Sequence, residues 1–130
     1  MKDKCVLVTG SSSGIGYEIT SKLLDLGAKV IGIARNHDRS KLENNNYITY
    51  NCDVSVHKKL EILLKQILKN HPQINCLISN AGYGDFGSLE NFSTIQINNF
   101  MATNLTSHFV ITKVLLPHFK RNKMGDIIFI

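Results

Sequence analysis

The chain has 130 residues, of which 43% are hydrophobic and 19% are charged, and its formal net charge is +5. This composition is typical of one packed, soluble domain, and it excludes a disordered chain, which would carry fewer apolar residues and more net charge. Apolar runs stay well short of the roughly 20 residues that cross a bilayer, and the lysines are scattered, so we expect neither a membrane nor a nucleic-acid partner.

The first part of the chain alternates short apolar runs with a helical pattern. The continuous run Cys5–Val8 predicts a strand that is buried on both faces, and a glycine-rich turn over residues 9–16 follows it. Apolar residues then recur at helical spacing until Gly27, which can end this helix. Val30–Ala34 predicts a second buried strand, and the polar residues 35–46 predict a loop with room for one helical turn.

Two further strands enclose a helix in the middle of the chain. Tyr47–Tyr50 is rich in β-forming residues and predicts a third strand. Ser55 can cap a helix whose apolar spacing continues to Asn70, shortly before Pro72. Cys76–Ile78 predicts a fourth strand, and the glycines that follow it predict a loop.

A long helix and a final strand complete the pattern. Ser93 or Thr94 can open the helix, which we expect over residues 94–120, and Ile127–Ile130 predicts a fifth strand. When strands alternate with helices, right-handed crossovers place helices on both faces of an open parallel sheet. We therefore predict a single three-layer α/β domain over residues 1–130.

Targeting and metal-binding signals point to an ordinary reducing compartment. The apolar run after Lys4 is too short for the core of a signal peptide. The three cysteines lack metal-ligand spacing, and their odd number argues against a disulfide framework. The five histidines have no partner arrangement in the sequence, so we assign them no chemistry. We expect a cytoplasmic protein without a metal.

The turn after the first strand has the composition of a phosphate-binding loop. Gly10, Gly14 and Gly16 allow positive φ angles or the close approach of a ligand to the backbone. The helix that follows begins with unpaired N–H groups and partial positive charge, which form a seat for a pyrophosphate beside the three serines at 11–13. A plain glycine-rich turn is the alternative, but the position between a strand and a helix favours dinucleotide binding.

Four motifs occur in order along the chain. Thr9–Gly16 has the spacing Thr-Gly-x-x-x-Gly-x-Gly, Cys52–Val54 follows the third strand, Asn80–Gly82 reads Asn-Ala-Gly after the fourth strand, and Asn104 lies in the long helix. Together they resemble the motifs of the short-chain dehydrogenase/reductase family. The resemblance spans the whole chain. It implies a Rossmann-type doubly wound sheet with strand order 3-2-1-4-5 that stops after its fifth strand.

The resemblance implies a role for each matching residue around a nicotinamide dinucleotide. Asp53 would accept a hydrogen bond from the adenine amino group beside Val54, and it can also cap the next helix. Asn80 would line the ribose, although it can equally bond strand backbone. Asn104 would hold a water of the proton relay, with a bond to helix backbone as the alternative. The implied cofactor-binding residues are Gly10, Ser12, Ser13, Gly14, Ile15, Gly16, Arg35, Asp53, Val54, Asn80, Ala81 and Gly82, and the implied catalytic residue is Asn104.

The end of the second strand predicts which dinucleotide is bound. An acidic residue there would accept hydrogen bonds from the ribose hydroxyls and favour NAD. Ala34 offers no carboxylate, and the adjacent Arg35 can bind a 2′-phosphate through charge-assisted hydrogen bonds. We therefore predict NADP(H) rather than NAD(H), with Arg39 as a weaker second candidate. A solvated loop arginine is the alternative interpretation of Arg35.

The family's acid/base pair, a tyrosine four residues before a lysine, is found at none of the four tyrosines of this sequence. The resemblance therefore implies the cofactor-binding part of an oxidoreductase that transfers hydride between nicotinamide and an alcohol or carbonyl. We expect residues 1–130 to be a partial domain without catalytic activity of its own. A standalone dinucleotide-binding sensor or scaffold is the alternative. The family also pairs its long helix with that of a second subunit, which implies a homo-oligomer through residues 94–120.

Overall fold

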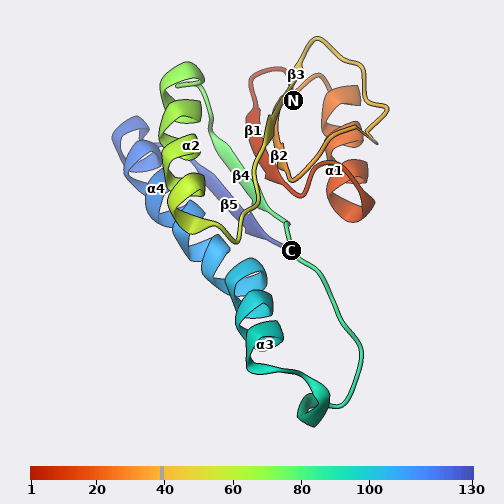
Figure 1. Cartoon of the computed structure of the whole chain (residues 1–130). Coiled ribbons are helices and arrows are strands. Elements are labelled where there is room, and N and C mark those ends of the chain that lie inside the picture. The colour runs from red at the N-terminus through yellow and green to blue at the C-terminus, as the bar shows by residue number, and fades with distance from the viewer. Residues whose placement is uncertain (39) are drawn as a thin grey trace.

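The computed structural model describes residues 1–38 and 40–130, and it contains a parallel sheet with helices on both sides (Figure 1). Strands alternate with helices along the chain, as the sequence predicts. The elements are β1 (Cys5–Thr9), α1 (Gly14–Asp25), β2 (Lys29–Ala34), β3 (Tyr47–Asn51), α2 (His57–Asn70), β4 (Cys76–Ser79), the 3₁₀ turn η1 (Leu89–Asn91), α3 (Thr94–Met101), the π-helical segment η2 (Ala102–Thr106), α4 (Ser107–Asn122) and β5 (Asp126–Phe129).

The five strands lie in the order β3-β2-β1-β4-β5, and every neighbouring pair is parallel, which confirms the predicted topology. The central strand is β1, where Val6 pairs with Val30 of β2 on one side and with Cys76 of β4 on the other. Because parallel strands all end at the same edge, the loops that follow them meet there. The strand order reverses at β1, and such a switch point opens a crevice for a ligand.

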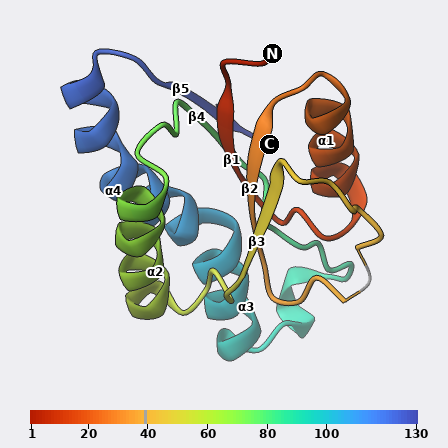
Figure 2. The same ribbon diagram turned by 90° about the horizontal axis from the view of Figure 1, so that it is seen from above.

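Helices α2 and α4 cover one face of the sheet, and α1 covers the other (Figure 2). The larger hydrophobic cluster lies on the α2–α4 side and includes the fully buried Leu7, Ile31 and Leu77. The smaller cluster lies on the α1 side and includes Val8 and Val30. Successive side chains of a strand point to opposite faces, so strands covered on both faces need continuous apolar runs. This explains the composition of β1, β2 and β4.

The start of α2 differs from the sequence prediction. Ser55 does not cap this helix, which begins at His57. Instead, the backbone N–H and the hydroxyl of Ser55 donate to the carboxylate of Asp53, at 2.9 and 2.7 Å. The hydroxyl of Ser55 is therefore directed to the carboxylate two residues earlier, and no side chain in the described part of the chain caps α2.

The predicted long helix begins as expected but is not regular throughout. Ser93 and Gln96 form a reciprocal capping box at its start. The segment η2 then widens the helix to π geometry, and α4 continues past Pro117 to Asn122. Among the described residues, no helix has the length and apolar character that crossing a membrane requires.

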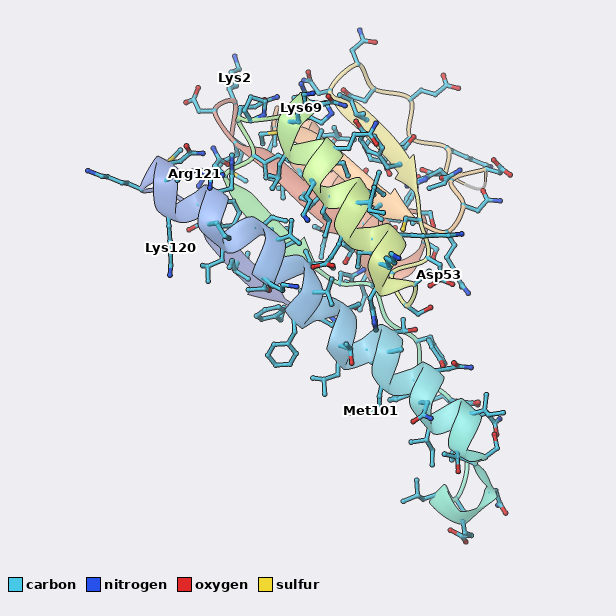
Figure 3. All side chains as sticks on the ribbon, turned by 60° about the vertical axis from the view of Figure 1, so that its left-hand side comes forward. Lys2, Asp53, Lys69, Met101, Lys120 and Arg121 are labelled. Atoms are coloured by element: carbon cyan, nitrogen blue, oxygen red, sulfur yellow. The ribbon has the colours of Figure 1, made fainter. Side chains whose placement is uncertain are left out.

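The segment α3 and the strand β5 leave apolar side chains at the surface. Every residue of α3 is exposed, and Figure 3 shows this helix extending away from the sheet. In β5, Ile128 is 45% exposed and Phe129 is 57% exposed. The apolar run of β5 therefore predicts the strand correctly, but not the burial that the same pattern confers on β1 and β2.

Candidate functional site

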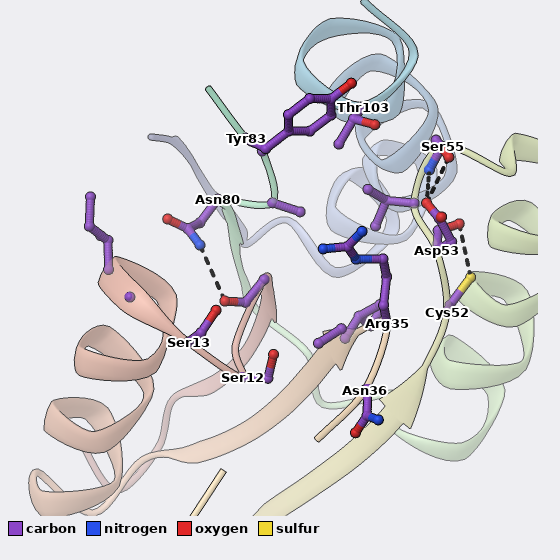
Figure 4. Close-up of a pocket in the computed structure, with 18 of the residues that line it drawn as sticks. Ser12, Ser13, Arg35, Asn36, Cys52, Asp53, Ser55, Asn80, Tyr83 and Thr103 are labelled. Atoms are coloured by element: carbon purple, nitrogen blue, oxygen red, sulfur yellow. Dashed lines mark hydrogen bonds between the residues drawn. The ribbon is translucent and has the colours of Figure 1, made fainter. Parts of the chain in front are cut away.

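A cavity of about 1170 Å³ lies at the edge of the sheet where the strands end (Figure 4). The loops that follow β1, β2, β3 and β4 form its walls, and α3 and η2 close one side. The predicted cofactor-binding residues come together here with one exception, Gly16. Those that line the cavity are Gly10, Ser12, Ser13, Gly14, Ile15, Arg35, Asp53, Val54, Asn80, Ala81 and Gly82.

The glycines of the β1–α1 turn serve two different purposes. Gly10 and Gly14 have φ angles of +71° and +53°, a left-handed conformation that glycine adopts at low cost. Gly16 lies beneath the turn and does not line the cavity. A Cβ atom there would overlap the carbonyl oxygen of Gly10 and the side-chain amide of Asn80. Gly16 therefore permits close packing of α1 on the turn, and its part in cofactor binding stays a prediction.

The N-terminus of α1 opens into the cavity. A Cβ atom at Gly14 would meet no atom within 4 Å, so the backbone is accessible there. Among the described residues, no side chain caps this helix, which leaves its first N–H groups and its positive end uncompensated. Ser12 and Ser13 line the same part of the wall. This arrangement suits a phosphate group.

Asn80 joins the end of β4 to the end of β1. Its Nδ2 donates to the carbonyl oxygen of Thr9 at 3.1 Å. The backbone N–H groups of Asn80 and Ala81 both donate to the Thr9 hydroxyl, each at 3.0 Å. The alternative in which Asn80 bonds strand backbone is therefore realised. Asn80 also lines the cavity, so this structural role is compatible with ligand binding.

Arg35 and Asp53 place opposite charges on the cavity wall. Arg35 follows the last residue of β2, is exposed, and points its guanidinium into the cavity in Figure 4. The two hydrogen bonds from Ser55 hold the pKa of Asp53 below its ordinary value, and the positive charge of Arg35 acts in the same direction. Val54 beside it is buried. The second arginine candidate, Arg39, lies outside the described residues.

Asn104 lies behind the cavity wall rather than in it. Its Oδ1 accepts a hydrogen bond from the N–H of Tyr83 at 3.0 Å, and its Nδ2 donates to the carbonyl oxygen of Tyr83 at 2.7 Å. These bonds join η2 to the loop that follows Gly82. The alternative in which Asn104 bonds the helix backbone is therefore wrong, because its amide is used on a distant loop. Its catalytic role stays a prediction.

Sequence reasoning missed several lining residues. Asn99 and Thr103 line the cavity from α3 and η2. They are four residues apart in the sequence, and this spacing could have predicted that they share one face of the long helix. Asn36 and Asp38 line it from the loop after β2, whose course a polar composition does not predict. Within the described ranges, no three His, Cys, Asp or Glu side chains gather where they could hold a metal ion.

Residues 4–130 match the family model described as short chain dehydrogenase. The chain belongs to the short-chain dehydrogenase family. An uncharacterized oxidoreductase of Saccharomyces cerevisiae is 30% identical over 129 residues, which are 98% of this chain and 42% of that protein. The chain spans 34% to 57% of the length of curated relatives that it matches.

Solved structures with the same fold hold either dinucleotide. ElxO with NADP bound has a TM-score of 0.87 at 26% identity, covering 99% of this chain and 55% of ElxO. A short-chain dehydrogenase of Leptospira borgpetersenii with bound NAD+ has a TM-score of 0.88 at 23% identity, covering 99% of this chain and 51% of that one. The second likeness shows the fold alone.

Proposed function

We propose that this short-chain dehydrogenase binds NADP(H) in the cavity at the ends of its strands. We further propose that it is the cofactor-binding part of an oxidoreductase that acts on an alcohol or a carbonyl. The observation that carries the proposal is the end of β2, where Ala34 presents no carboxylate and Arg35 lines the cavity. A guanidinium pairs with a phosphate through parallel charge-assisted hydrogen bonds.

The other lining residues fit the remaining parts of this cofactor. The open N-terminus of α1 at Gly14 suits the pyrophosphate. Asp53, kept ionised by Ser55, is an acceptor for the adenine amino group, and Val54 offers an apolar contact to its ring. Asn80 lines the same cavity, and its side chain is our candidate for contact with the ribose. When bound, the nicotinamide supplies a donor or acceptor of hydride, while these residues supply position and charge.

NAD(H) is the competing cofactor, and one observation favours it. Asp38 also lines the cavity, and its carboxylate accepts a hydrogen bond from Asn36 at 2.9 Å. A carboxylate in this loop can accept hydrogen bonds from ribose hydroxyls and repels a 2′-phosphate. Arg35 and Asp38 therefore favour different dinucleotides, and substitution of each one separately decides between them.

The test is a measurement of affinity for NADPH and for NADH by isothermal titration calorimetry. We expect this chain to bind NADPH more tightly than NADH. Arg35→Ala should remove that preference, because it should lower the affinity for NADPH and leave the affinity for NADH unchanged. Asp38→Asn should raise the affinity for NADPH, because it removes a negative charge that repels the 2′-phosphate. Lys41→Ala is the matched control, because Lys41 is an exposed cation of the same loop that does not line the cavity. Equal affinities in the unsubstituted chain, or a preference that survives Arg35→Ala, would contradict the proposal.

Hydride transfer needs an acid/base group that this sequence does not supply in the Tyr-x-x-x-Lys pattern. We therefore propose cofactor binding without turnover for residues 1–130, as part of a catalytic whole. A sensor or scaffold that only binds the dinucleotide is the second candidate. NADPH-dependent carbonyl reduction by a longer chain that contains these residues supports the first candidate, and binding without reduction supports the second.

We also propose that the long helix associates with a second copy of the chain. Its surface carries a row of exposed apolar side chains, at Ile97, Phe100, Met101, Leu105 and Phe109. Burial of such a row against an identical one would remove apolar area from water. Analytical ultracentrifugation should detect a dimer that Phe109→Glu dissociates, and a monomer at all concentrations would contradict this proposal.

A further inference from the structure

Four side chains beside the cavity form one continuous hydrogen-bonded chain. The Tyr47 hydroxyl donates to Ser11 Oγ at 3.1 Å, Ser11 Oγ lies 3.0 Å from His37 Nε2, and His37 Nδ1 lies 2.8 Å from Asn51 Oδ1. The chain connects the turn after β1, the loop after β2 and both ends of β3. Ser11 is fully buried, and His37 and Tyr47 are half-buried. No partner of His37 can be recognised in the sequence, and the fold supplies two, Ser11 and Asn51.

The polarity of this chain is consistent at every atom. Asn51 Oδ1 can only accept, so Nδ1 of His37 carries the proton and donates to it, and Nε2 accepts a hydrogen bond from the Ser11 hydroxyl. The Ser11 oxygen then accepts from Tyr47. A neutral imidazole thus forms hydrogen bonds with both of its partners. The buried hydroxyl of Ser11 is also paired, and an unpaired hydroxyl at this position would destabilise the fold.

Gly32 makes room for this chain in the middle of β2. A Cβ atom at Gly32 would overlap Ser11 Oγ and would lie 2.7 Å from the Tyr47 hydroxyl. Glycine weakens the interior of a strand, and it commonly marks the close approach of another group. The rings of His37 and Tyr47 also meet edge to face, with centroids 6.2 Å apart. The core of the sheet is therefore shaped around this network.

The residue types Ser, His and Asn also occur together in nucleophilic sites, but Ser11 is fully buried and no substrate can reach it. The position of His37 in its loop indicates a different role. Arg35 and Asn36 precede it, Asp38 follows it, and all three line the cavity while His37 does not. Since Arg35 and Asp38 carry opposite charges, the conformation of this loop decides which charge meets the 2′ position of the ribose.

We propose that His37 is a positioning residue that fixes the loop after β2 on the Ser11 turn and thereby sets the preference for a 2′-phosphate. The inference rests on the proposed function, because it concerns how Arg35 is presented to the cofactor. Without the hydrogen bonds of His37 the loop is mobile in the free protein. NADPH must then order Arg35 when it binds, which makes the free energy of NADPH binding less favourable. NADPH loses affinity, whereas NADH, which makes no contact with the guanidinium through a phosphate, does not.

The test compares His37→Leu with His37→Gln by calorimetry with NADPH and NADH. We expect His37→Leu to lower the NADPH-to-NADH affinity ratio about tenfold, the effect of one lost hydrogen bond to a positioned group. His37→Gln should keep the ratio, because glutamine can accept from Ser11 and donate to Asn51. The matched control is His71→Leu, which removes the 2.9 Å bond of His71 to Tyr50 away from the cavity and should lower stability but not the ratio.

The outcomes separate this inference from the proposed function. If Arg35→Ala removes the preference but His37→Leu leaves it intact, the role of His37 is wrong and the cofactor assignment stands. An equal fall in the ratio for His37→Leu and His71→Leu also overturns it, because general destabilisation then explains both. If the unsubstituted chain shows no preference, both proposals fail. If His37→Leu does not fold, Asn51→Ala removes the exposed end of the network, and an unchanged ratio in that variant overturns the inference.

Discussion

The strands beside the cavity and the edge strand β5 have similar sequences but different surroundings. Ile31 of β2 is fully buried, whereas Ile128 of β5 is 45% exposed. On the α1 face, α1 contacts β1 and β2, and a second cavity of about 530 Å³ lies between Leu23 of α1 and β5. An apolar run is sufficient for a strand, but burial depends on what covers it. Three of the four loops that form the walls of the candidate site follow β1, β2 and β4, whose residues are almost all buried.

The largest difference in stability should appear when an isoleucine is shortened to alanine in each region. We expect Ile31→Ala to lower the free energy of unfolding by about 3 kcal/mol, because it leaves a cavity in the larger hydrophobic cluster. Ile128→Ala should cost less than about 1 kcal/mol, since half of its side chain already contacts water. Urea denaturation measures both values. Similar losses would mean that β5 is covered in solution by a group such as a second copy.

A smaller effect should follow from adding a methyl group beneath the glycine-rich turn. Gly16→Ala forces its Cβ against the Gly10 carbonyl and the Asn80 amide, so we expect a loss of about 2 kcal/mol in stability and weaker dinucleotide binding. Gly84→Ala is the control, because a Cβ there meets no atom within 4 Å. Thermal unfolding and calorimetry report the two effects. Unchanged binding in Gly16→Ala would show that the turn tolerates movement.

The covered region is also the one that the sequence predicts best. A strand buried on both faces must be continuously apolar, and a turn in the left-handed region selects glycine, so β1, Gly10 and Gly14 leave clear signals. Their positions relative to each other follow from the rule for parallel crossovers. The cavity and its glycine-rich wall could therefore be predicted before the structure.

Features that depend on contacts between distant segments could not be predicted. The π geometry of η2 coincides with a hydrogen bond from His57 of α2 to the Ala102 carbonyl at 3.0 Å and with the bonds between Asn104 and Tyr83. None of these pairs is visible in a helical period. The same holds for His37, whose partners Ser11 and Asn51 come from other elements. Periodicity reports which face is apolar, and it does not report which groups meet.

The exposed region should depend more on local hydrogen bonds than on burial. All residues of α3 are exposed, and the Ser93–Gln96 capping box stabilises its start. We expect Ser93→Ala to lower the stability of α3 by about 1 kcal/mol. Amide hydrogen exchange should become faster in α3 and stay unchanged in β1. Gln96→Ala should have a weaker effect in the same direction, because it removes the other half of the box. Faster exchange throughout the sheet would contradict the independence of the two regions.

The smallest effect should be a dependence on pH that distinguishes the regions through one histidine in each. Burial lowers the pKa of His71, which bonds Tyr50 of β3, and of His108, which meets the ring of Phe129 of β5 edge to face. In the unfolded chain each histidine takes up a proton near pH 6.5, whereas in the folded chain it does so only at lower pH. The free energy of unfolding therefore has its full value above pH 6.5 and decreases as the pH falls below 6.5. Urea denaturation at pH 7.5 and 5.5 should show this fall, and His71→Gln should flatten it more than His108→Gln, because the exposed surroundings of β5 can rearrange to hydrate a charged His108. Equal flattening by the two variants would mean that β5 is packed as firmly as the strands beside the cavity.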